Sequence, residues 1–202
     1  MPELPEVETV VRGLREPLIG HTIQSMWYDW ENTIHSPDAL EFSARIEGQT
    51  VQAINRRAKY ILIELDTDTL IVHLKMTGRL YVADNDEQQT ADKWVHVRFD
   101  LDKGKQLRFS DSRKFGKVYL SDNTDTLLGH LGPEPLEDDF TLEVFRERLE
   151  GRSKIIKALL LDQTFVAGIG NIYADEALFR AGIHPMVRSD QLSDQDTELL
   201  HQ

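Results

Sequence analysis

The sequence predicts an α+β fold in which an N-terminal helix and an antiparallel β-sandwich precede an all-helical domain. Apolar residues recur with helical spacing at the start of the chain, alternate with a period of two over residues 21–120, and then return to helical spacing. Many short strands with no helix between them favour a sandwich or barrel over a parallel sheet. Pro133 and Pro135 mark a linker, so we divide the chain into domains at 1–130 and 131–202.

The first predicted helix runs from about Pro5 to Arg15. Its apolar residues recur at i, i+3, i+4 and i+7 and form a single stripe: Val7, Val10, Val11 and Leu14. Pro5 suits the first turn, where its missing N–H costs nothing, and acidic Glu6 complements the positive end of the helix dipole. Pro17 is expected to end the helix, because the residue before a proline disfavours helical geometry.

Strands rich in β-branched residues are expected through the first domain, at 22–29, 49–55, 58–65, 69–74, 78–83, 94–99, 105–110 and 117–121. Helices are expected in the second domain, at 141–149, 154–161, 171–181 and from Ser193 to the end of the chain. Ser193 and Asp196 have the spacing of a capping pair for that last helix.

Composition narrows the function classes. The chain has 202 residues, with 23 Lys and Arg against 35 Asp and Glu, a net charge of −12, and no cysteine. A disulfide scaffold and a thiolate zinc site are therefore excluded. No apolar run approaches the roughly 18 residues of a membrane span, so we expect a cytoplasmic protein without a membrane partner. The negative charge argues mildly against a polyanionic ligand, although segments 56–59 and 105–117 are locally basic.

The N-terminus can carry covalent chemistry. Removal of Met1 would leave Pro2 with a secondary amine at the chain end. An α-amino group titrates near pKa ~8, so part of the amine is unprotonated, and therefore nucleophilic, at neutral pH. Attack on an aldehyde-like carbon would give an iminium ion, and Glu3 beside it could donate or accept a proton. The alternative is that these residues only begin and cap a helix.

Two other segments could contact nucleic acid. The glycine turn 168–170, followed by Asn171 and a helical pattern, would present backbone N–H groups to a phosphate, or could be an ordinary helix cap. In the loop 111–116, Phe115 stands beside cations and could be either a core residue or a wedge between bases. Met76 lies in a comparable turn and could equally fill a gap in the core.

Together these segments resemble formamidopyrimidine-DNA glycosylase, in the order of that family and across nearly the whole chain. The similar motifs are PELPEVE at 2–8, RRAKY at 56–60, HLKMTG at 73–78, DSRKFG at 111–116, LGPEPL at 131–136 and the glycine-turn segment 162–176. The resemblance implies a β-sandwich and a helix-two-turns-helix domain that bind double-stranded DNA containing oxidised purines or abasic sites. It implies base-excision repair of 8-oxoguanine and formamidopyrimidines, with strand cleavage by β,δ-elimination.

The resemblance also implies the site residues. Pro2 would be the nucleophile at C1′, Glu3 the acid that assists opening of the sugar ring, and Lys59 a further catalytic residue. Lys59, His73 and Asn171 match phosphate-binding positions, while Met76, Arg113 and Phe115 match the trio that fills the space left by the flipped nucleotide. The remaining matches concern the helix start and the damaged-base pocket: Glu6, Ile172, Tyr173 and Glu176.

The family ordinarily continues with more of the helical domain and a four-cysteine zinc finger, neither of which is in these 202 residues. From the sequence we therefore expect a truncated product with no metal or other cofactor, with reduced activity and low DNA affinity. A monomer is expected, with association through the incomplete helical face as an alternative. Two other functions stay open: a non-catalytic fragment that binds damaged DNA, and a structural domain that binds protein partners.

Overall fold

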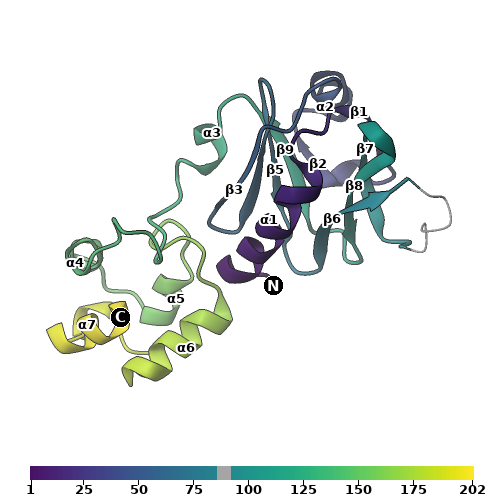
Figure 1. Ribbon diagram of the computed structural model, residues 1–202. Coiled ribbons are helices and arrows are strands. Elements are labelled where there is room, and N and C mark those ends of the chain that lie inside the picture. Colours follow the sequence, from purple (N-terminus) through teal and green to yellow (C-terminus); the bar gives the residue numbers. More distant parts are fainter. Residues whose placement is uncertain (86–91) are drawn as a thin grey trace. The chain divides into compact units, whose positions relative to one another are not determined.

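The computed structural model describes residues 1–85 and 92–202 (Figure 1). The chain divides into two compact units, Met1–Leu128 and Gly129–Gln202. The first unit contains helices α1 (Leu4–Leu18) and α2 (Ala39–Ile46) and two β-sheets, and the short helix α3 (Asp125–Leu128) lies at its end. Short 3₁₀ turns interrupt the loops of both units at Glu31–Thr33, Asp102–Gly104 and Ser189–Gln191.

The two sheets form the predicted β-sandwich. The four-stranded sheet has the order β1 (Ile23–Tyr28), β7 (Val95–Leu101), β8 (Lys105–Asp111) and β6 (Gly78–Asp84). The five-stranded sheet has the order β2 (Ile34–Ser36), β9 (Lys117–Ser121), β5 (Thr69–His73), β4 (Tyr60–Glu64) and β3 (Ala53–Arg57). Alternate side chains of both sheets enter one apolar core, among them Phe99 and Phe109 from one sheet and Ile61 and Val72 from the other.

Helix α1 begins and ends beyond its predicted limits. Three residues of the predicted stripe, Val7, Val11 and Leu14, are buried in the sandwich core, whereas Val10 packs against the core and is only partly buried. Leu18, beyond the predicted end of the helix, is buried as well. The helix continues through Pro17 because this proline lies in the last turn, where a single backbone bond is lost, and the burial of Leu18 outweighs that loss.

The expectation that the sandwich contains no helix is wrong. Helix α2 follows Asp38, whose side chain accepts from the N–H groups of Leu40 and Glu41, and it buries Phe42 and Ile46. Eight residues give too few turns for a clear periodicity.

The short strand β2 was also not predicted, and it is parallel to β9, whereas the other strand pairs in the described part of the two sheets are antiparallel. Strand β3 begins four residues later than the predicted strand, at Ala53.

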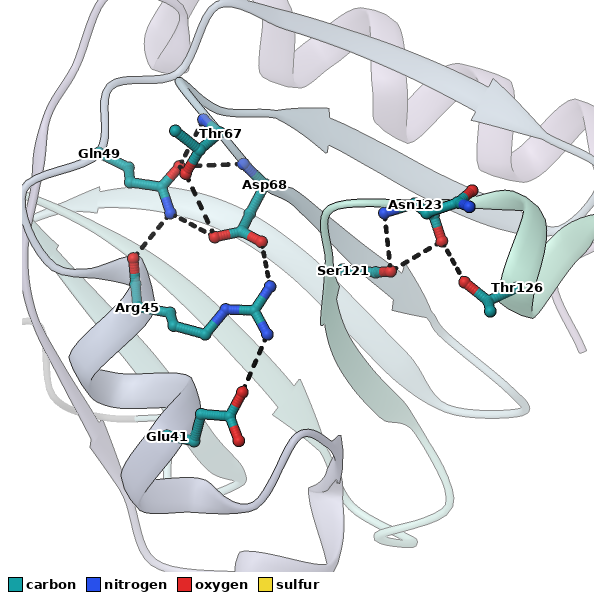
Figure 2. Close-up of polar contacts among 8 residues, drawn as sticks. All are labelled: Glu41, Arg45, Gln49, Thr67, Asp68, Ser121, Asn123 and Thr126. Carbon is teal, nitrogen blue, oxygen red and sulfur yellow. Dashed lines mark hydrogen bonds and ion pairs between the residues drawn. The ribbon is translucent and has the colours of Figure 1, made fainter.

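A polar network around the buried side chains of Gln49 and Asp68 holds α2 to the turn between β4 and β5 (Figure 2). The guanidinium of Arg45 donates to the carboxylate of Asp68, and the amide of Gln49 donates to the same carboxylate at 2.7 Å. The side-chain oxygen of Gln49 in turn accepts from the backbone N–H groups of Thr67 and Asp68, at 3.0 and 3.2 Å. The turn is thus fixed to the helix by side chains that are themselves satisfied.

The second unit is helical, as predicted, with helices α4 (Leu142–Leu149), α5 (Ile156–Leu160), α6 (Asn171–Ala181) and α7 (Asp194–His201). A separate apolar cluster that includes Phe145, Leu159 and Phe165 forms its core. Ser193 and Asp196 form the predicted capping box at the start of α7. Among the helices of the described residues, none combines the length and the apolar character that crossing a membrane requires.

Candidate functional site

The N-terminus of α1 presents a buried carboxylate. Glu3 is the N-cap residue and is 2% exposed. Its backbone N–H donates to the carboxylate of Glu6 at 2.9 Å, and the two side chains complete a capping box. The start of the helix therefore fixes the position of Glu3, the residue after Pro2, and the carboxylate of Glu6 supports that position.

Lys59 is a second buried charged residue of the same unit. It is 4% exposed and lies in the turn between β3 and β4, after Ala58 at φ 52°. The guanidinium of Arg56 holds this turn by donating to the carbonyl of Ala58 at 3.2 Å. Burial lowers the pKa of Lys59, the charge of Glu3 opposes this shift, and the charge of Lys75 adds to it. The lysine is therefore closer to neutral than an ordinary one and is suited to proton transfer.

His73, at the end of β5, is held as a neutral donor. Its ring lies 4.6 Å, centroid to centroid, from the ring of Tyr60, its register partner on β4. The backbone N–H of Lys75 donates to Nδ1 at 2.9 Å, which leaves the proton on Nε2. Burial, together with the charges of Lys75 and Lys59, lowers the pKa of His73 to about 3.

Met76, Arg113 and Phe115 come together from two turns. Met76 is 47% exposed and Phe115 50% exposed, so the possibility that either is a core residue is excluded. A guanidinium nitrogen of Arg113 lies 3.4 Å from the sulfur of Met76, and the guanidinium carbon lies 4.9 Å from the ring centroid of Phe115. The three predicted space-filling residues thus form one exposed cluster.

The predicted residues of the second unit lie on the first turns of α6. Gly170 is the N-cap residue, and Asn171, Ile172, Tyr173 and Glu176 follow it with exposed side chains. The side chain of Gln163 holds the preceding turn by accepting from the N–H of Gly168 at 3.0 Å and donating to the carbonyl of Ile169 at 2.9 Å. Gly168 has φ 98°, a conformation that favours glycine.

Comparison with known proteins decides the family. Residues 1–118 match the formamidopyrimidine-DNA glycosylase N-terminal domain, and residues 131–202 match the formamidopyrimidine-DNA glycosylase H2TH domain. The chain belongs to the formamidopyrimidine-DNA glycosylase family. It is 43% identical over 203 residues to the formamidopyrimidine-DNA glycosylase of Protochlamydia amoebophila and 49% identical over 207 residues to that of Chloroflexus aggregans. These alignments cover 100% of this chain and 73% and 74% of the two relatives.

Solved structures of this glycosylase family have the same fold. The complex of the Lactococcus lactis protein with DNA containing an abasic site matches 98% of this chain and 74% of that protein, with 38% identity and a TM-score of 0.90. A complex of MutM with DNA containing carbocyclic 8-oxo-G matches 99% of this chain and 76% of that protein, with 38% identity and a TM-score of 0.91.

Two residues of the first unit that pattern alone does not single out support the cluster of Met76, Arg113 and Phe115. Asp111 is 1% exposed, and its carboxylate accepts hydrogen bonds from several groups of the loop 111–116 and from the hydroxyl of Thr77. An aspartate followed two residues later by an arginine in a turn-rich loop was the available signal, because Asp side chains often bind nearby backbone N–H groups.

Within residues 1–85 and 92–202, no group of three or more acidic or histidine side chains could hold a metal ion.

Proposed function

We propose that this chain excises oxidised purines, namely 8-oxoguanine and formamidopyrimidines, from double-stranded DNA and cleaves the strand at the resulting abasic site. One observation carries this proposal: Pro2 precedes a buried carboxylate, Glu3, whose charge reaches a buried lysine, Lys59. A potential amine nucleophile, an acid and a group able to exchange protons are therefore contributed by one unit. Because the chain belongs to the formamidopyrimidine-DNA glycosylase family, we assign DNA glycosylase chemistry to this arrangement.

The first step is displacement of the damaged base. Once Met1 has been removed, the nitrogen of Pro2 forms a bond with C1′ of the damaged nucleotide. The glycosidic bond breaks and its electron pair leaves with the base, while the bonded Pro2 nitrogen releases its N–H proton, which the departing base takes up. Glu3 donates a proton to the sugar ring oxygen as the C1′–O bond opens, and the nitrogen lone pair completes an iminium ion.

The second stage cleaves the strand. The iminium ion acidifies C2′, so loss of a proton there expels the 3′ phosphate, and a second elimination expels the 5′ phosphate. We assign proton exchange in this stage to Lys59, whose pKa is lowered by burial. The amine supplies the covalent chemistry, so the proposed steps use no cofactor.

The other residues hold the DNA. We assign Lys59, His73 and Asn171 to phosphate groups, and the cluster of Met76, Arg113 and Phe115 to the space that the flipped nucleotide vacates. We assign contact with the damaged base to the exposed side chains of α6, namely Ile172, Tyr173 and Glu176, and support of the helix start to Glu6. We further propose that the protein acts as a monomer in the cytoplasm.

A borohydride trap tests the covalent step. The protein is incubated with an 8-oxoguanine·C duplex and, separately, with an abasic-site duplex, and the adduct is located by mass spectrometry, which also reports whether Met1 is present. We expect an adduct at Pro2 with both duplexes. A Met1-free chain that binds both duplexes without an adduct would instead be a non-catalytic binder of damaged DNA.

Two further outcomes are informative. An adduct on the abasic duplex alone would restrict the activity to strand cleavage without base excision. A salt titration of DNA affinity should show a steep loss of affinity as salt rises, because phosphate contacts release counterions. A flat salt dependence would favour a protein-binding domain.

A further inference from the structure

The turns that carry Met76 and Phe115 are built alike. In each turn a lysine with a positive φ precedes the exposed apolar residue: Lys75 has φ 53° and Lys114 has φ 58°. Such a conformation is unfavourable for a non-glycine residue, so the surrounding structure must hold it. Each turn also ends at a glycine with no room for a side chain. A Cβ on Gly78 would lie 2.4 Å from the carbonyl oxygen of Leu74, and one on Gly116 would lie 2.2 Å from the ring of Phe109.

The sheet places these two turns side by side. Gly78, the first residue of β6, is the register partner of Asp111, the last residue of β8. Thr77 precedes Gly78, and its hydroxyl donates to the carboxylate of Asp111. A side-chain hydrogen bond therefore connects the turn of Met76 to the loop of Phe115, at the point where backbone pairing ends.

Asp111 organises the second turn. Besides the hydroxyl of Thr77, its carboxylate accepts from the backbone N–H groups of Arg113 at 3.1 Å, Phe115 at 2.8 Å and Gly116 at 2.7 Å. The carboxylate is buried, yet these hydrogen bonds outweigh the burial and lower its pKa. Asp111 is therefore ionised at neutral pH, and its carboxylate accepts hydrogen bonds from both turns.

We infer that Asp111 and Thr77 are positioning residues that hold Met76, Arg113 and Phe115 as one preassembled unit, which enters the vacated space in the DNA as a whole. This inference rests on the proposed function. Ordering a flexible side chain at an interface costs conformational entropy, and preassembly moves that cost from DNA binding to folding. Loss of the Thr77–Asp111 hydrogen bond should therefore slow nucleotide flipping and leave the amine chemistry of Pro2 intact.

The test compares two substrates. Base excision from an 8-oxoguanine·C duplex requires flipping and filling of the vacated space, whereas cleavage at an abasic site in single-stranded DNA requires neither. Thr77→Val keeps the shape of the side chain and removes the hydroxyl, and Thr77→Ser keeps the hydroxyl. We expect Thr77→Val to slow single-turnover excision about tenfold, as the loss of about 1.4 kcal/mol would. Cleavage of the single strand should change less than twofold, and Thr77→Ser should restore excision.

A second readout follows the insertion itself. With 2-aminopurine beside the lesion, the fluorescence rise that reports unstacking should be slower for Thr77→Val and for Asp111→Asn than for the unmodified protein. In a Phe115→Ala background, Thr77→Val should add little further loss, because Thr77 acts through the unit that Phe115 completes.

Several results would overturn the inference. Folded Thr77→Val with unchanged excision, equal losses on both substrates, or additive losses with Phe115→Ala would each contradict it. Failure of the unmodified protein to form an adduct with any of these DNAs would instead reject the proposed function.

Discussion

The backbone N–H of Lys75 donates to Nδ1 of His73 at 2.9 Å, and this bond determines what His73 can offer a ligand. Because Nδ1 is an acceptor, Nε2 carries the proton. Burial lowers the pKa of the ring to about 3, with Lys75 and Lys59 adding to the effect. The side chain is therefore a neutral hydrogen-bond donor across the physiological range, although histidine ordinarily titrates within it.

The contribution of His73 to DNA affinity should not depend on pH. A hydrogen bond to a charged phosphate contributes about 1.5–3 kcal/mol, so His73→Ala should weaken binding roughly ten- to a hundredfold. Since the ring is neutral well above pH 3, the same fold-loss is expected at pH 5.5 and at pH 8. Fluorescence anisotropy with an abasic-analogue duplex measures both values. A loss that grows markedly as the pH falls would indicate an imidazolium contact.

The example of His73 shows where sequence reasoning ends. The run of apolar and β-branched residues at 69–74 predicts strand β5, in which every residue after Thr69 is buried. The tautomer of His73 depends on the backbone of Lys75, which adopts a positive φ that no local sequence pattern predicts. The bond between Thr77 and Asp111 joins residues 34 positions apart, so only the register of β6 and β8 brings them together. Helix α2 was missed because its stability comes from the burial of Phe42 and Ile46.

Titration of Lys59 should make the rate of strand cleavage depend on pH. Its pKa lies below the ordinary value of about 10.4, so its neutral fraction grows at a lower pH than that of an exposed lysine. Single-turnover cleavage at an abasic site should therefore rise with pH along a limb whose apparent pKa is below that value. Lys59→Arg, which stays charged, should abolish the limb.

Lys75→Arg is the matched control for this measurement. It keeps a cation near Lys59 and His73, so the limb should persist. A limb that survives Lys59→Arg and disappears in Lys75→Arg would assign the titration elsewhere.

Gly116 should tolerate no side chain. A Cβ at this position would lie 2.2 Å from Cζ of Phe109, a core ring, and 3.2 Å from the carboxylate of Asp111. Gly116→Ala should destabilise the protein by about 1–3 kcal/mol, the usual cost of overpacking, and urea unfolding measures this. Gly13 lies in the exposed part of α1, where a Cβ would have nothing within 4 Å, so Gly13→Ala should stabilise by up to about 1 kcal/mol. Equal effects of the two substitutions would show that the close approach at Gly116 is relieved without cost.

The network around Asp68 should matter for stability and not for catalysis. Asp68→Ala leaves the guanidinium of Arg45 and the buried amide of Gln49 without their shared acceptor, which should cost about 2–4 kcal/mol in urea unfolding. Glu41→Ala removes the more exposed partner of Arg45, a carboxylate that is 52% exposed, and should cost less than about 1 kcal/mol. Where both variants are folded, their single-turnover cleavage rates at an abasic site should match that of the unmodified protein, because this turn holds none of the proposed catalytic residues. A large loss of cleavage in folded Asp68→Ala would show that the turn between β4 and β5 transmits strain to Lys59 at the other end of β4.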